Sequence, residues 1–213
     1  MNLKYFFDPL CGWCYGAAPL LEAAGRVSGL KLELLAGGLW PRPTSLPAAM
    51  RAQIRAADAR VGQMTGQPYG KAYLEGWLED ESTLLDSRPP TAAWLAVQSI
   101  APERGLAMIM AIHKAHYVDG RRVVELEVLT DLAGSFGLGV EAFKAALASV
   151  DVSAHVNNTR RAMARLNVGG FPAAFLESAG EIENVPLQSF FGDPAGFARM
   201  LQAATERYRA TLN

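Results

Sequence analysis

The sequence predicts an α/β fold in which a small sheet domain is interrupted by a large, all-helical insertion. Strand-like apolar runs occur near the two ends of the 213-residue chain, the long middle section shows helical periodicity, and turn-forming residues mark the changes between them. With 50% hydrophobic and 19% charged residues, the chain can bury a sizeable core. We expect three parts: residues 1–44, 45–150 and 151–213.

The N-terminal part reads as strand, helix and strand. Residues 3–7 are mostly apolar, as expected of a strand covered on both faces, and a turn-forming Asp-Pro pair ends the run. A helix over residues 12–27 follows, in which Pro19 removes one backbone hydrogen bond and implies a kink. Residues 30–35 give a second strand, which the βαβ connection makes parallel to the first.

The middle of the chain, from residue 46 to about residue 167, is mostly helical and contains no convincing strand. Asp151 or Ser153 caps the last of these helices. After it we expect a hairpin over residues 173–187 and a final helix over residues 194–208. The breaks between the middle helices fall at turns that contain Gly or Pro, namely 66–68, 87–90, 101–102 and 119–120.

The only two cysteines, Cys11 and Cys14, are separated by two residues and follow the first strand directly. On the first turn of a helix, the outer thiol meets backbone N–H groups and the positive end of the helix dipole, which favour the nucleophilic thiolate. The second sulfur lies one turn inward, close enough to form a disulfide. We therefore expect a dithiol redox centre with an exposed, attacking Cys11 and a buried, resolving Cys14.

Half of a zinc site is the alternative interpretation of this pair. Zinc usually takes four ligands, and without a second CxxC the site would need His113, His116 or His155. His113 and His116 have the spacing of a metal pair, but no carboxylate pattern accompanies them, so solvated or half-buried histidines are the stronger interpretation. We expect no bound metal and no bound cofactor.

Three residues beside the cysteines are candidates for tuning the site. Gly12 and Trp13 affect the redox potential through the N–H groups that meet the thiolate, and Trp13 is as readily a substrate contact as a packing residue. Asp8 is either a proton acceptor for Cys14 or a turn former. The other tryptophans near the helical part are expected to pack its core or to line an apolar groove over the cysteines: Trp40, Trp77 and Trp94.

A second motif, Gly170-Phe171-Pro172, precedes the predicted hairpin. Together with Cys11-Gly12-Trp13-Cys14 and Pro19 it resembles the thioredoxin superfamily, in which a cis X-Pro bond faces the CxxC helix. The order of elements resembles the DsbA family of that superfamily. Phe7-Asp8-Pro9 and Gly37-Gly38-Leu39 are similar to its cytoplasmic, FrnE-like branch, near glutathione transferase kappa and 2-hydroxychromene-2-carboxylate isomerase.

This resemblance implies a thioredoxin-like fold with a large inserted all-helical domain. It also implies a thiol–disulfide oxidoreductase that oxidises, reduces or isomerises disulfides through a mixed disulfide. Gly170, Phe171 and a cis Pro172 would bind an extended substrate through the backbone. The kappa transferases and the isomerase usually carry serine at the position of Cys11, so the cysteine pair favours redox exchange over the alternative, a glutathione-dependent transferase or isomerase.

Composition limits the partners and the compartment. A net charge of −1 gives no electrostatic reason to expect nucleic acid. No apolar stretch approaches the ~20 residues of a membrane span, and no secretory signal is recognisable, so we expect a cytoplasmic protein without a membrane partner. The partner would be a thiol or disulfide of a protein, peptide or small molecule. The resemblance raises glutathione as a co-substrate and a homodimer as expectations; the physiological substrate and the direction of the reaction stay open.

Overall fold

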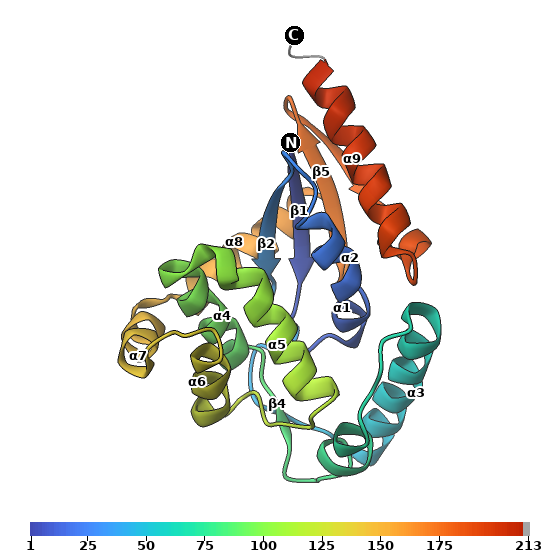
Figure 1. Cartoon of the computed structure of the whole chain (residues 1–213). Helices are drawn as coiled ribbons and strands as arrows, with labels where there is room; N and C mark the ends of the chain where they lie inside the picture. Colours follow the sequence, from blue (N-terminus) through green and yellow to red (C-terminus); the bar gives the residue numbers. More distant parts are fainter. Residues whose placement is uncertain (211–213) are drawn as a thin grey trace.

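The computed structural model describes residues 1–210, and at its centre lies a four-stranded sheet (Figure 1). The strand order is β2-β1-β5-β6. Strands β1 and β2 are parallel, whereas β5 is antiparallel to both β1 and β6. Phe6 pairs with Leu35 on one side and with Ala173 on the other, so the sheet joins the two ends of the chain. The strands are β1 (Asn2–Phe7), β2 (Lys31–Ala36), β5 (Ala173–Ser178) and β6 (Glu181–Val185).

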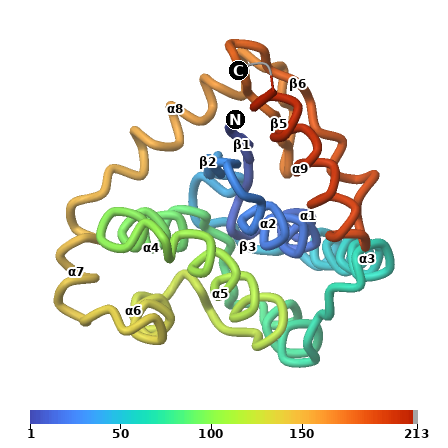
Figure 2. The backbone as a smooth tube through the Cα atoms, turned by 45° about the horizontal axis from the view of Figure 1, so that its top comes forward, coloured from blue at the N-terminus to red at the C-terminus, as the bar shows by residue number. Residues whose placement is uncertain are grey.

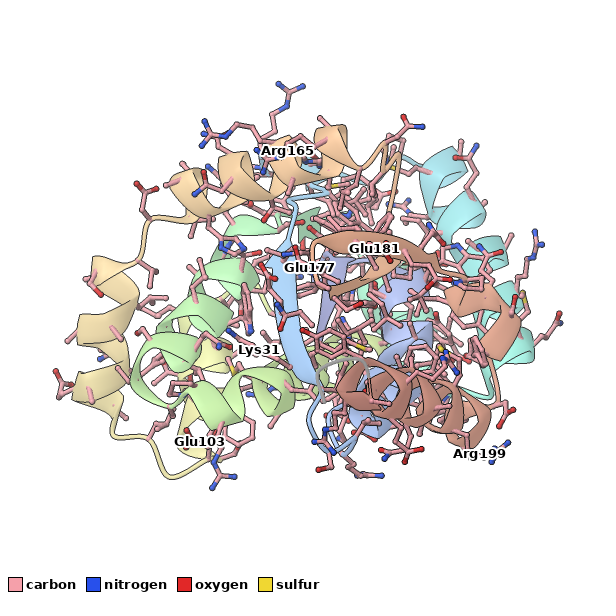
Figure 3. All side chains as sticks on the ribbon, turned by 90° about the horizontal axis from the view of Figure 1, so that it is seen from above. Lys31, Glu103, Arg165, Glu177, Glu181 and Arg199 are labelled. Carbon is pink, nitrogen blue, oxygen red and sulfur yellow. The ribbon has the colours of Figure 1, made fainter. Side chains whose placement is uncertain are left out.

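Helices cover both faces of this sheet. Figure 3 shows α8 and α9 on opposite sides of it, and α2 packs beside α9. Successive residues of β1 point to opposite faces: Phe6 packs against Met163 of α8, whereas Leu3 and Phe7 belong to the larger core with α2 and α9. This explains why the strand is apolar on both sides. The helices are α1 (Gly12–Gly16), α2 (Ala18–Ala24), α8 (Val152–Arg165) and α9 (Pro194–Ala210).

The single kinked helix predicted after β1 consists of two short helices, α1 and α2. They separate at Ala17, and Pro19 is the second residue of α2. Because proline lacks an N–H and is tolerated in the first turn of a helix, the chain restarts a helix here instead of bending one. The second helix ends at Ala24, three residues earlier than predicted.

The helices between β2 and α8 gather at the end of the sheet where β1 ends (Figure 1). The prediction of no strand in this part is wrong, because β3 (Thr44–Ser45) pairs antiparallel with β4 (Leu84–Leu85). Strands of two residues are too short to show a periodicity. Within residues 1–210, no helix combines the length and hydropathy needed to cross a bilayer. The remaining elements are α3 (Ala48–Thr65), the π-helical η1 (Ala72–Trp77), α4 (Arg88–Ile100), the 3-10 helix η2 (Pro102–Arg104), α5 (Gly105–Tyr117), α6 (Leu126–Gly134), α7 (Val140–Ser149) and the 3-10 helix η3 (Leu187–Phe190).

Candidate active site

The two cysteines lie where β1 has ended and α1 begins. Cys11 is the N-cap residue of α1, and its carbonyl accepts the N–H of Cys14 at 2.9 Å. Both are free thiols, and the two sulfurs lie within hydrogen-bonding reach of each other. Burial above all, and then the neighbouring Cys11 thiol, raise the pKa of Cys14 well above its usual value. The geometry is that of a pair ready to close a disulfide.

Cys11 is less accessible than the sequence predicts. Only 6% of the surface of Cys11 is exposed, so the prediction of an exposed thiol is wrong. The predicted burial of Cys14 is confirmed, because its exposed fraction is 0%. The Cys11 Sγ donates to the carbonyl oxygen of Phe171 at 3.7 Å, and it borders a cavity of about 160 Å³ beneath the helical part. Cys11 is covered because the loop that contains Phe171 and the helical part, which are distant in sequence, both pack over it.

The loop that meets Cys11 contains the Phe171–Pro172 peptide bond, which is cis. This loop leads into β5, whose pairing with β1 brings its first residues to the end of the sheet where the cysteines lie. The Phe171 ring packs so closely over Gly37 that a Cβ there would lie 2.3 Å from it, and the guanidinium of Arg160 lies 5.2 Å from the ring centre. Gly170 is exposed. The structure thus brings the two predicted motifs together.

Asp8 connects three segments around the site. Its fully buried carboxylate accepts the N–H of Leu10 at 2.9 Å, the N–H of Leu39 at 2.6 Å and the hydroxyl of Ser87 at 2.9 Å. Burial raises the pKa of Asp8 although these hydrogen bonds lower it. The bond to Leu10 is a turn-forming contact, and the carboxylate also lies near enough to raise the pKa of Cys14.

Trp13 forms the rim of the site. Its ring is half-buried and stacks on Phe191, with 6.0 Å between centroids and 12° between planes. The guanidinium of Arg60 lies 5.9 Å from the Trp13 ring centre. Trp13 borders both the small cavity and a second groove of about 520 Å³ that runs along Phe171 and Pro172. It therefore packs on one face and contributes surface to the site.

Asp58 of α3 is a site residue that the sequence analysis missed. Its side chain is 3% exposed, and a Cβ at Gly12 would lie 2.5 Å from its Oδ1, so α3 packs directly on the CxxC turn (Figure 2). Its Oδ2 accepts the hydroxyl of Tyr73 at 2.7 Å. Burial raises the pKa of Asp58 to about 6, although Tyr73 lowers it. Its position between Ile54 and Val61 on the inner face of the helix is the available signal.

The histidines on α5 are buried, which corrects the prediction of solvated or half-buried side chains. His113 is 1% exposed and His116 is 2% exposed, because α5 packs among α1, α2, α4 and α6. Burial lowers the pKa of each to about 3, so both are neutral at physiological pH. The third histidine, His155, lies on α8, and its Nε2 accepts a hydrogen bond from the backbone N–H of Ala36. Within residues 1–210, no three His, Cys, Asp or Glu side chains group to hold a metal ion.

A thioredoxin-like sheet that sets a CxxC pair against a cis-proline loop defines a thiol–disulfide exchange domain. Residues 2–193 match the family model described as DSBA-like thioredoxin domain, and the chain belongs to this family. This confirms the predicted family and fold, and places the chain among DsbA-like thiol–disulfide oxidoreductases. No protein with a curated description matches the chain.

Three solved structures show how far the similarity extends. The cytosolic disulfide reductase DsbM from Pseudomonas aeruginosa, also solved with GSH, is 41% identical, with a TM-score of 0.89 over 97% of this chain and 99% of that chain. A putative protein disulfide isomerase from Nitrosomonas europaea is 27% identical, with a TM-score of 0.81 over 97% of each chain. A 2-hydroxychromene-2-carboxylate isomerase, 18% identical with a TM-score of 0.61 over 100% of each chain, shares the fold.

Proposed function

We propose that this chain reduces disulfides in the cytoplasm, with Cys11 as the attacking and Cys14 as the resolving cysteine. The Cys11 thiolate attacks one sulfur of the substrate disulfide, and the other leaves as a thiolate that takes up a proton. Cys14 then loses its proton and attacks the Cys11 sulfur, which releases the second substrate thiol and leaves a Cys11–Cys14 disulfide. Two electrons pass to the substrate in each cycle, and a cellular thiol such as glutathione returns them.

The observation that carries this proposal is the 3.7 Å contact between the Cys11 Sγ and the carbonyl oxygen of Phe171. A substrate strand that pairs with the backbone at Gly170, Phe171 and Pro172 would bring its own disulfide against Cys11. The groove of about 520 Å³ along this loop gives such a strand room. Asp8, Gly12 and Trp13 hold the turn in place around the sulfurs.

The similar structures and the charges near the site support the proposed direction of the reaction and glutathione as its co-substrate. DsbM is named a cytosolic disulfide reductase and has been solved with GSH, which supports reduction, the cytoplasm and glutathione for this chain as well. The guanidinium groups of Arg60 and Arg160 lie over the rings of Trp13 and Phe171, respectively. These cations suit the carboxylates of a peptide thiol.

Trapping the mixed disulfide tests this proposal. When Cys14→Ser is mixed with glutathione disulfide, intact-mass spectrometry should show one glutathione attached at Cys11, and Cys11→Ser should show none. The wild-type protein should instead close its own disulfide and release both glutathiones. Full catalytic turnover by Cys14→Ser would contradict the two-cysteine mechanism and favour the glutathione-dependent transferase or isomerase alternative.

A further inference from the structure

The cavity beside Cys11 has a wall that the thiol chemistry does not explain. It lies between α1 and the helical part, has a volume of about 160 Å³, and is mostly apolar and aromatic. Asp58 and His116 are the polar exceptions besides Cys11 and tyrosine. The aromatic rings on the wall belong to Trp13, Trp40, Tyr73, Trp77 and Tyr117.

Asp58 gives this cavity a negative charge at neutral pH. No lysine or arginine among the described residues lines the cavity, and the neighbouring Arg55 is bound to the carbonyl of Leu74 and to the carboxylate of Glu79. His116 is neutral because burial lowers its pKa to about 3. Tyrosine hydroxyls donate hydrogen bonds to the Asp58 carboxylate, but no lysine or arginine among the described residues forms an ion pair with it, so a cation from outside the protein would stabilise its charged form.

We propose that the cavity binds the ammonium group of a small aminothiol or of its disulfide, with Asp58 as the counter-ion, while the sulfur of the same molecule reacts with Cys11. This inference rests on the proposed function and names a substrate class for it. A carboxylate in a cavity lined by aromatic rings is an environment that can recognise ammonium groups, through charge-assisted hydrogen bonds and cation–π attraction.

The size of the cavity favours a short arm. A volume of about 160 Å³ corresponds to about five waters at the roughly 30 Å³ that each occupies in the liquid. It is smaller than the roughly 300–1,000 Å³ of pockets that enclose a whole drug-sized ligand. An aminoalkyl group fits such a space, whereas a folded protein substrate would have to use the groove along Phe171 and Pro172. Among the residues that the structure describes, the wall also offers no cation that would receive a carboxylate.

Two disulfides of similar size test this charge preference. Cystamine carries an ammonium group on each arm, whereas bis(2-hydroxyethyl) disulfide carries a neutral hydroxyl in the same place. Each disulfide is added in excess to the pre-reduced protein, and tryptophan fluorescence follows the closure of the Cys11–Cys14 disulfide in a single turnover. Because cysteamine is intrinsically the better leaving group, each rate constant is divided by that of the same disulfide with dithiothreitol.

We expect the wild-type protein to prefer cystamine by about tenfold or more in this normalised ratio, as befits a charge-assisted contact in a low-dielectric site. Asp58→Asn, which keeps the size of the side chain, should bring the ratio close to one. The matched control is Glu22→Gln, which removes the same charge from an exposed position on α2 and should keep the preference. A ratio unchanged in Asp58→Asn overturns the proposal.

The preference should also depend on pH. Because the pKa of Asp58 is raised to about 6, the carboxylate is charged above that pH, and the cystamine preference should fade as the pH drops through it. The tyrosines and His116 stay neutral throughout, because burial raises the pKa of the tyrosines and lowers that of His116. The titratable groups around Asp58 are Arg55 on α3, Tyr69 and Tyr73 around η1, His116 and Tyr117 on α5, and Cys11 at α1.

A failure of the proposed function can be told apart from a failure of this inference. If neither disulfide oxidises the cysteine pair, the proposed function is wrong, and the cavity is then judged by binding alone. Tryptophan fluorescence would compare S-methylcysteamine with 2-(methylthio)ethanol, neither of which can undergo exchange. Tighter binding of the amine, lost in Asp58→Asn, supports the cavity; equal binding of the two compounds overturns it.

Discussion

Asp58 should make the stability of the protein depend on pH in a way that the structure specifies. Its pKa rises from an ordinary value of 3.8 to about 6 because the side chain is buried. An acid with a raised pKa in the folded state contributes stability that is fully present below pH 3.8 and is lost as the pH rises through 6. At 1.36 kcal/mol per pH unit, the loss over this interval is about 3 kcal/mol.

Urea unfolding of Asp58→Asn and of the wild-type protein measures this loss. The free energy of unfolding of the variant minus that of the wild type should rise by about 2 kcal/mol between about pH 4.5 and about pH 8, the part of the titration that lies in this range. Other titrating groups are common to both proteins and cancel, and Glu22→Gln should show no such rise. A pH-independent difference would refute the reasoning, because Asp58 would then ionise as it does in the unfolded chain.

Other substitutions test other parts of the site. Asp8→Ala leaves buried donors without an acceptor and should lower the free energy of unfolding by about 3–5 kcal/mol in urea. Gly37→Ala places a Cβ 2.3 Å from the Phe171 ring and should slow disulfide exchange, whereas Gly76→Ala, with open space around it, should not. His116 contributes stability that is present above pH 6.5 and is lost as the pH falls towards 3. The free energy of unfolding of His116→Phe minus that of the wild type should therefore rise by about 2 kcal/mol as the pH falls from about 7 to about 5.

The sheet and the sulfur pair could be predicted because their signals are local. The apolar run in β1 predicts a strand covered on both faces, and in the structure Phe6 does face α8 while Leu3 faces α2. The spacing of Cys11 and Cys14 is visible without any tertiary information. The Phe171-Pro172 loop needed a resemblance, since an X-Pro pair before a strand has no chemistry of its own. These features are fixed within a few residues of sequence.

The cavity could not be predicted in the same way, because its wall comes from segments that meet only after folding. The spacing of Ile54, Asp58 and Val61 indicates that Asp58 lies on the inner face of α3, but the sequence does not indicate that this face docks on the CxxC turn. The burial of His113 and His116 did have a signal: α5 is apolar on nearly all sides, which is typical of a buried helix. The spacing of the two histidines by itself does not show this signal.

Taken together, the two proposals separate the chemistry of the site from its selectivity. The sheet supplies the reactive part, because β1 positions Cys11 and β5 positions the Phe171 carbonyl against it. The helical part supplies the charges: α3 directs Asp58 inward to the cavity and Arg60 outward over Trp13. A zwitterionic thiol, with an ammonium group and carboxylates, would meet the opposite charge at each end while its sulfur lies at Cys11. Substitutions on α3 should therefore change which disulfides react, while the two sulfurs and the cis-proline loop determine that they react at all.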